Sequence, residues 1–154
     1  MAIKNPELRV MVDANILISG IIWPRWPFEV LQHAIRKDFH LILCEYAITQ
    51  ARVHIQRRFG NYLDQFDEFL TFSDFEIVDN PSKELVSQNI LLVRDPTDVP
   101  IALAAIHSNV DILVSEDKDL TVKESSTKKL HNQLRVMISG TFLREIMGWT
   151  SGSA

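Results

Sequence analysis

The sequence has a single cysteine, Cys44, among its 154 residues. One cysteine can form neither an internal disulfide nor a metal site built from several thiolates, and we expect it to be a small buried side chain. No apolar run reaches the ~18 residues that a membrane-spanning helix needs. The first residues, MAIKNPELRV, show no secretory signal. These absences predict a cytoplasmic protein with no membrane association.

Several other features are missing. There is no internal repeat, no low-complexity tract, no glycine-rich phosphate loop, and no hydroxyl nucleophile grouped with a histidine and an acid. An excess of positive charge, which is usual in nucleic-acid binders, is also absent, because the formal net charge is −4. Bound divalent cations would neutralise a site made of carboxylates, so the net charge does not decide the question. The length fits one domain, predicted over residues 1–148, with residues 149–154 as a flexible tail.

Short apolar runs alternate with helical patterns along the chain. Apolar periodicity predicts helices over 28–38, 45–58, 61–72 and 141–147 and another from Pro100. Predicted strands occupy 8–12, 40–44, 75–78, 111–115 and 135–139. The apolar run 16–22 contains Gly20, residues 84–94 are ambiguous, and residues 121–134 fit a loop or a poorly formed helix. Strands separated by helices predict an α/β fold with a mostly parallel sheet.

Acidic residues stand at comparable places in this pattern. Asp13 ends the first predicted strand, Asp117 follows a later strand, and Asp98 precedes a helix. Capping explains an aspartate near a helix start, but it does not explain two aspartates at the ends of apolar strands. Because the carboxyl ends of parallel strands converge, we expect these three side chains to meet, with Asp95 and Asp119 nearby.

Converging carboxylates repel one another. Two unit charges 4 Å apart cost roughly 4 kcal/mol at an effective dielectric constant near 20, so such a group requires protons or a cation. All-oxygen ligands favour Mg²⁺ or Mn²⁺ over zinc. A site of this kind can activate water and stabilise a leaving oxygen, and hydrolysis of phosphodiester bonds makes the best use of both properties.

At this point the sequence resembles the PIN-domain family, in particular its small prokaryotic members that act as toxins of toxin–antitoxin pairs. VMVDANILISGII looks like the first strand of that family, with Asp13 as a metal ligand and Asn15 hydrogen-bonded within the site. RDPTDVPIALAA looks like the third-acid motif, with Asp98 as ligand and Asp95 as auxiliary, and DILVSEDKDL resembles the closing motif, with Ser115 supporting and Asp117 ligating. The resemblance covers residues 8–147 and implies a three-layer α/β/α fold, ribonuclease activity with Mg²⁺ or Mn²⁺, a small antitoxin partner and a homodimer.

One position departs from the family pattern. Gln50 aligns with a glutamate that the family usually carries in the helix after the second strand, and glutamine is a poorer ligand for a hard cation. Glu45 lies about 140° around the helix and should not replace it. His54 and Arg57 share the Gln50 face. Either the three aspartates suffice for activity, or activity is reduced or lost.

Basic and aromatic residues give further candidates, each with a plain structural alternative. Candidates for holding RNA phosphates are Lys118 and Lys123 and, on the helix over 45–58, Arg52, Arg57 and Arg58, although a solvated surface explains them equally well. Trp23 and Trp26 fit loop packing or a dimer contact better than base stacking. Phe66 and Phe69 are expected to face solvent and to form the dimer surface.

Two functions compete with the nuclease. A degenerate PIN fold that binds RNA or protein without cutting is motivated by Gln50. A receiver domain or a haloacid-type phosphatase would need paired acids or Asp-x-Asp after the first strand, where this chain has Asp13-Ala14-Asn15. The first strand therefore fits neither of these proteins well.

Overall fold

A computed structural model describes residues 4–150 of the chain, and within that range a single sheet of five parallel strands forms the centre. The strands lie in the order β3-β2-β1-β4-β5. Their bounds are β1 Arg9–Val12, β2 His40–Cys44, β3 Glu76–Val78, β4 Ile112–Val114 and β5 Arg135–Met137. The strand order reverses direction at β1, whose neighbours are β2 and β4. In an open parallel sheet such a reversal leaves a crevice at the carboxyl ends of the two diverging strands.

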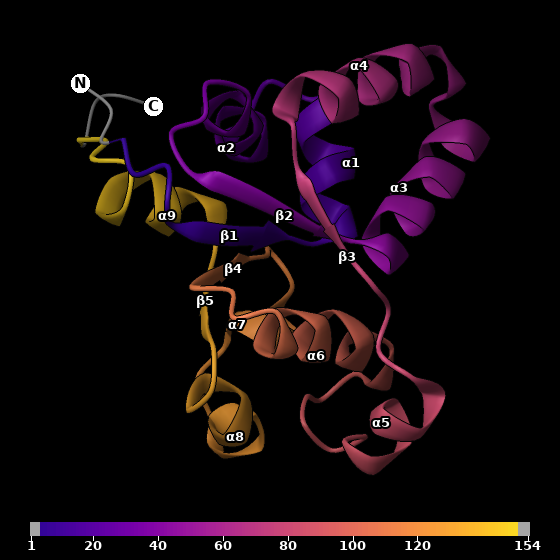
Figure 1. Cartoon of the computed structure of the whole chain (residues 1–154), viewed down its shortest axis with the longest axis vertical. Coiled ribbons are helices and arrows are strands. Elements are labelled where there is room, and N and C mark those ends of the chain that lie inside the picture. Colours follow the sequence, from indigo (N-terminus) through magenta and orange to yellow (C-terminus); the bar gives the residue numbers. More distant parts are fainter. Residues whose placement is uncertain (1–3, 151–154) are drawn as a thin grey trace.

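Helices cover both faces of the sheet (Figure 1). On one side lie α1 (Ala14–Ile22), α2 (Trp26–Ile35), α3 (Glu45–Arg58) and α4 (Leu63–Ser73), with α9 (Ser139–Glu145) beside α2. On the other side lie α6 (Val99–His107), α7 (Lys118–Thr121) and α8 (Lys128–His131), and α5 (Lys83–Gln88) flanks α6. The predicted three-layer α/β/α fold with a parallel sheet is therefore confirmed.

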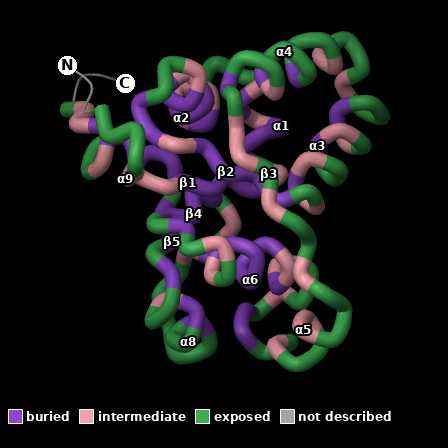
Figure 2. Tube along the Cα trace, in the orientation of Figure 1, coloured by how far each residue is buried: buried purple, intermediate pink, exposed green. Residues whose placement is uncertain are grey.

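The core lies between the sheet and the helices, and the three central strands are its most deeply buried part (Figure 2). Val10, Met11 and Val12 of β1 are completely buried. A strand covered on both faces needs such a continuous apolar run, which is why LRVMV predicted it correctly. Cys44 is buried as expected. Within residues 4–150 no helix is long and apolar enough to cross a membrane.

The apolar run after Asp13 is a helix, α1, rather than a continuation of the first strand. Gly20 lies at its closest approach to α2, because a Cβ atom built there would lie 2.5 Å from Leu31 Cδ1 and 3.0 Å from the Pro27 carbonyl oxygen. The glycine that interrupts the sequence pattern is thus a packing position between two helices. Its apolar neighbours are buried at Ile16, Leu17 and Ile18 and partly buried at Ile21 and Ile22, so no polar stripe marked the run as a helix.

Two further expectations differ from the structure. Phe66 and Phe69 are 0% and 4% exposed, so the prediction that they face solvent and form a dimer surface is wrong; Phe72 of the same helix is the exposed aromatic. Residues 151–154 of the predicted tail lie outside the described residues. Trp149, also assigned to that tail, is packed: its Nε1 donates to His33 Nε2 at 2.9 Å.

Replacing Gly20 by alanine is expected to lower the free energy of unfolding by about 1–3 kcal/mol, because the added methyl group overpacks the α1–α2 contact. Gly60→Ala is the matched control, since a Cβ atom there meets nothing within 4 Å. Urea unfolding of the two variants and the parent protein measures the difference. Equal free energies of unfolding for the two variants would show that α1 and α2 can move apart to accept the methyl group without loss of stability.

Candidate metal centre

Two aspartates of the crevice are placed by the ends of β1 and β4. Asp13 follows β1 and caps α1, because its Oδ1 accepts a hydrogen bond from Ile16 N at 3.0 Å. Asp117 caps α7, where its Oδ1 accepts from Asp119 N at 2.8 Å. Each capping bond uses one carboxylate oxygen and satisfies a helix donor that would otherwise be unpaired. Capping therefore fixes both side chains at the crevice.

Ser115 joins these two aspartates from within the core. Its side chain is completely buried, and its hydroxyl donates a short hydrogen bond to Asp13 Oδ2. The Ser115 hydroxyl oxygen also accepts from Asp117 N at 3.0 Å. The hydroxyl thus sets the distance between the end of β1 and the loop after β4, which is the supporting role predicted for Ser115.

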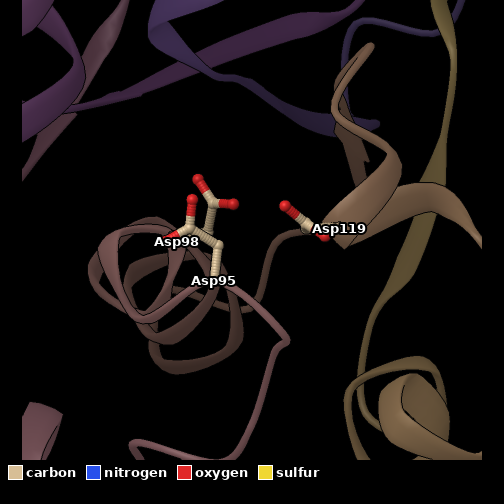
Figure 3. A group of neighbouring side chains, drawn as sticks. All are labelled: Asp95, Asp98 and Asp119. Atoms are coloured by element: carbon tan, nitrogen blue, oxygen red, sulfur yellow. The ribbon is translucent and has the colours of Figure 1, made fainter.

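Three carboxylates lie close together between the start of α6 and α7. Asp95, Asp98 and Asp119 each present an oxygen, and these atoms all lie within 4.8 Å of one another. Figure 3 shows Asp95 and Asp98 rising from the same turn, while Asp119, in the first turn of α7, points toward them. Asp95 is held by Thr97, whose N–H and hydroxyl donate to its Oδ1 at 3.0 and 2.8 Å. Asp98 also interacts with Asp117 and Asp13, so it connects these carboxylates with the pair at the ends of β1 and β4.

Burial and mutual repulsion raise the pKa values of two of these acids. Burial raises the pKa of Asp13 from 3.8 to about 6, although the bonds from Ser115 and Ile16 favour its charged form. The pKa of Asp98 rises from 3.8 to about 8, first through burial and then through the neighbouring carboxyls of Asp117, Asp95 and Asp13. Asp98 is therefore repelled by Asp117, Asp95 and Asp13, and an oxygen of Asp119 also lies within 4.8 Å, so Asp98 stands at the centre of the negative charge.

One oxygen of Asp98 has no partner. Among residues 4–150, Oδ2 of Asp98 is the buried side-chain oxygen or nitrogen that lacks any hydrogen bond. The nearby carboxyl of Asp117 cannot donate to it unless one of the two carries a proton. A buried, unsatisfied carboxylate oxygen is costly, and a cation would remove the cost. Carboxylates alone, without thiolate or imidazole, suit Mg²⁺ or Mn²⁺, so the residues fit such an ion.

Arg94 is a cation that sequence reasoning missed. Its Nε lies 3.0 Å from Asp119 Oδ1 and its Nη1 lies 2.7 Å from Glu124 Oε1. Asp119 thus already shares its charge with a guanidinium, whereas Asp98 does not. The pairing makes Asp119 a weaker candidate metal ligand than Asp98. No motif in the sequence predicted the Arg94–Asp119 pair.

The acids open into a cleft of about 770 Å³ whose opposite wall is α3. Gln50, His54 and Arg57 line it, as their shared helix face predicted. Gln50 Nε2 donates to the Tyr46 hydroxyl at 2.9 Å, and that hydroxyl donates to the carbonyl oxygen of Thr97 at 3.4 Å. Residue 50 is therefore tied to the turn that carries Asp98. The four-residue spacing of Tyr46 and Gln50 was the available signal for this link.

The remaining candidates lie at the margin of the cleft or outside it. Asn15 lines it but makes no side-chain hydrogen bond within residues 4–150, unlike the expected role. Arg52 pairs with Asp67 at 2.7 Å and stacks over Phe66, on a face of α3 outside the cleft. Lys118 does not line the cleft, and Lys123 lines a separate hollow beside β5.

A family model for the PIN domain matches residues 9–119. The chain belongs to the PIN-domain family. The match contains Asp13, Asp98 and Asp117 together with the α3 wall, so the whole acidic crevice of this PIN domain lies inside the family region. The resemblance drawn from the three sequence motifs is thereby confirmed.

Two solved structures share the fold of this PIN domain. PAE2754 from Pyrobaculum aerophilum is 15% identical with a TM-score of 0.61, over 89% of this chain and 88% of that one. VapBC2 from Rickettsia felis, solved bound to a promoter DNA fragment, is 18% identical with a TM-score of 0.54, over 84% and 97% of the two chains. A comparison with curated proteins found no match. At these identities the structural likeness establishes the fold alone.

Asp98→Asn is expected to make the stability of the metal-free PIN domain less dependent on pH. Because the folded-state pKa of Asp98 is raised to about 8, the folded protein keeps a proton that the unfolded chain loses near pH 4. The free energy of unfolding of the parent protein therefore falls as the pH rises from about 4 to about 8. Asparagine at position 98 does not titrate, so this decrease in the free energy of unfolding disappears in the variant. We put the decrease at about 2 kcal/mol, because the Asp98 carboxyl is only half-buried and solvent screens its interactions.

Urea unfolding at pH 5 and pH 8 in EDTA measures this difference, and Mn²⁺ is then added at pH 8. Mn²⁺ is expected to stabilise the parent protein and to have little effect on Asp98→Asn. An equal response of the two proteins to Mn²⁺ would contradict a site centred on residue 98.

Proposed function

We propose that the protein is an endoribonuclease that hydrolyses RNA phosphodiester bonds with Mg²⁺ or Mn²⁺ held by Asp13, Asp98 and Asp117. The observation that carries the proposal is the unpartnered, buried Oδ2 of Asp98 among acids that repel it. Membership of the PIN-domain family supports it, since the same three motifs supplied these residues. Asp95 and Asp119 adjoin this set and would serve as auxiliary ligands.

The chain prepares the crevice for a negatively charged substrate through fixed geometry. Ser115 and the α1 cap hold both oxygens of Asp13 before any substrate arrives. Thr97 holds Asp95 in the same way. Preorganised groups of this kind need little rearrangement as charge develops in a transition state. The open cleft admits both the RNA strand and the attacking water.

The divalent ion would supply Lewis-acid stabilisation of the phosphoryl oxygens and acidify the attacking water. Every other requirement falls to the protein. The carboxylates of residues 13, 98 and 117 would bind the ion, and Ser115 holds the first and last of them through its hydroxyl. Without a cation, the same carboxylates would repel the phosphates of RNA.

Asp13→Asn is expected to lower metal-supplemented RNA cleavage by about 10²–10³-fold, the effect of losing one strong electrostatic group at a reacting centre. A labelled RNA assay with Mn²⁺ and with EDTA measures it. Asp64→Asn, an exposed change in the first turn of α4, is the control and should keep full activity. Cleavage that survives Asp13→Asn would be the work of a contaminant or of another site.

A second candidate function is a PIN fold that binds RNA or a protein without cutting it. Gln50 in place of the usual glutamate favours this alternative, because the cleft then lacks an acid on its α3 side. Glu45, the nearest acid of that helix, is exposed and does not line the cleft. Activity of the parent protein under saturating Mn²⁺ separates the two functions.

Gln50→Glu is expected to strengthen Mn²⁺ binding about tenfold and to raise cleavage at limiting metal, because it adds a carboxylate to the ligand shell. Isothermal titration calorimetry gives the affinity. Thr49→Glu adds the same charge at the neighbouring position of the cleft wall and should help far less. Equal gains from both changes would mean that general attraction, rather than ligation at residue 50, is responsible.

We also propose that the protein is the toxin of a toxin–antitoxin pair and a homodimer in the cytoplasm. Its likeness in fold to VapBC2 from Rickettsia felis supports the first part. The dimer surface cannot include Phe66 or Phe69, which lie in the core of the chain. A small partner that covers the acidic crevice would hold the nuclease inactive.

A further inference from the structure

One continuous stripe of α3 forms the wall of the cleft opposite the acids. Its members recur at the spacing of three and four residues that keeps side chains on one helix face. They are Tyr46, Thr49, Gln50, Val53, His54, Arg57 and Arg58. The stripe changes character along the helix, from neutral and polar beside the aspartates to basic at the far end. With 1.5 Å of rise per residue, Arg57 lies about 10 Å beyond Gln50 along the axis.

The basic end of the stripe has no counter-ion among the described residues. Six of the nine arginines of the sequence pair with a carboxylate or stack over an aromatic ring. Within residues 4–150, Arg57, Arg58 and Arg25 form no ion pair and no ring contact. Arginine near a helix C-terminus interacts favourably with the helix dipole, but that does not explain why two of them line the cleft. Free guanidinium groups facing a cleft are suited to phosphate.

An exposed aromatic ring packs against Phe59, the residue that follows these two arginines in the chain. Trp23 ends α1 and Phe59 ends α3, and their rings meet edge to face at 5.6 Å. Phe59 in turn lies 6.0 Å from the ring of His54, which lines the cleft. Trp23 remains 41% exposed, and Arg25 follows it by two residues. α1 begins at the Asp13 cap, and the far ends of α1 and α3 meet through the rings of Trp23 and Phe59. Figure 1 shows the two helices on the same side of the sheet.

We infer that this end of the cleft binds single-stranded RNA next to the cut, with Arg57 and Arg58 on backbone phosphates and Trp23 stacked on an unpaired base. The inference rests on the proposed nuclease function and adds the substrate class and the course of the strand. Because Arg57 lies about 10 Å beyond Gln50 along α3, the phosphates held here would be close neighbours of the one cleaved. Only an unpaired base offers its face to an aromatic ring, which favours single strands over duplex RNA.

RNA affinity tests the inference independently of cleavage. All proteins carry Asp98→Asn so that the RNA stays intact, and binding of a labelled single strand of about 12 nucleotides is followed by fluorescence anisotropy over a salt series. Arg57→Gln/Arg58→Gln is expected to weaken binding at least tenfold at low salt. The slope of log Kd against log salt should fall by about 1.4, which is 0.7 for each phosphate that an arginine no longer neutralises.

Lys128→Gln/Lys129→Gln is the matched control, because it removes the same charge from exposed residues of α8. It should change the affinity less than twofold. Trp23→Leu keeps an apolar contact for Phe59 and is expected to weaken single-strand binding about fivefold, with an unchanged salt slope. The affinity for a duplex of the same sequence should not respond to Trp23→Leu. Thermal unfolding of each variant checks that its fold is retained.

Contrary results are distinct for each part. Equal losses of affinity in the arginine variant and the lysine control would overturn the arginine contacts. An unchanged RNA affinity in the arginine variant would overturn them too, and is the result expected if these arginines bind an acidic protein partner instead. An unchanged affinity in Trp23→Leu, or an equal weakening for duplex RNA, would overturn the single-strand assignment. Failure of the parent protein to cleave RNA would instead refute the proposed function and leave these binding results to stand.

Discussion

Mutual repulsion of carboxylates in a partly buried crevice is the constraint on which the rest of this structure depends. The repulsion is clearest at Asp98, because one of its oxygens is buried without a hydrogen-bond donor and its pKa is raised to about 8. A protein selected for stability alone would not assemble these groups, because each adds free energy to the folded state without a proton or a cation. Strain of this kind concentrates where a function requires it.

The fold withstands this repulsion because strong contacts elsewhere hold the strands in register. At the amino ends of the strands, Arg9 makes a bidentate ion pair with Glu76 at 3.1 Å, and His40 forms a hydrogen bond with the same carboxylate at 2.9 Å. These bonds join β1, β2 and β3 and lower the pKa of Glu76 to about 2. After β3, Asn80 Oδ1 accepts from Tyr46 N at 2.7 Å and so fixes the first turn of α3. The ion-pair group and the Asn80 hydrogen bond both lie outside the crevice, and together they orient the strands and the helix that form it.

The distribution of charge matters more here than its sum. A net charge of −4 is unfavourable for binding RNA, yet the acids gather at one end of the cleft and unpaired arginines at the other. A divalent ion at the acidic end would remove much of the repulsion locally. The cleft therefore differs in charge between its two ends. The net charge of the chain does not report this difference.

The sequence by itself determined the alternation of strands and helices, the family, and the identity of the acids, because each depends on local patterns: apolar runs, turn residues and aspartates at the ends of strands. Tertiary structure decided that Asp98 is surrounded by the other acids, that Asp119 is paired with Arg94, and that Phe66 is buried rather than free for a dimer. It also selected Arg57 over Arg52 as the cleft arginine. The physical reason is that exposure and pairing depend on residues distant in the chain, which no local pattern records.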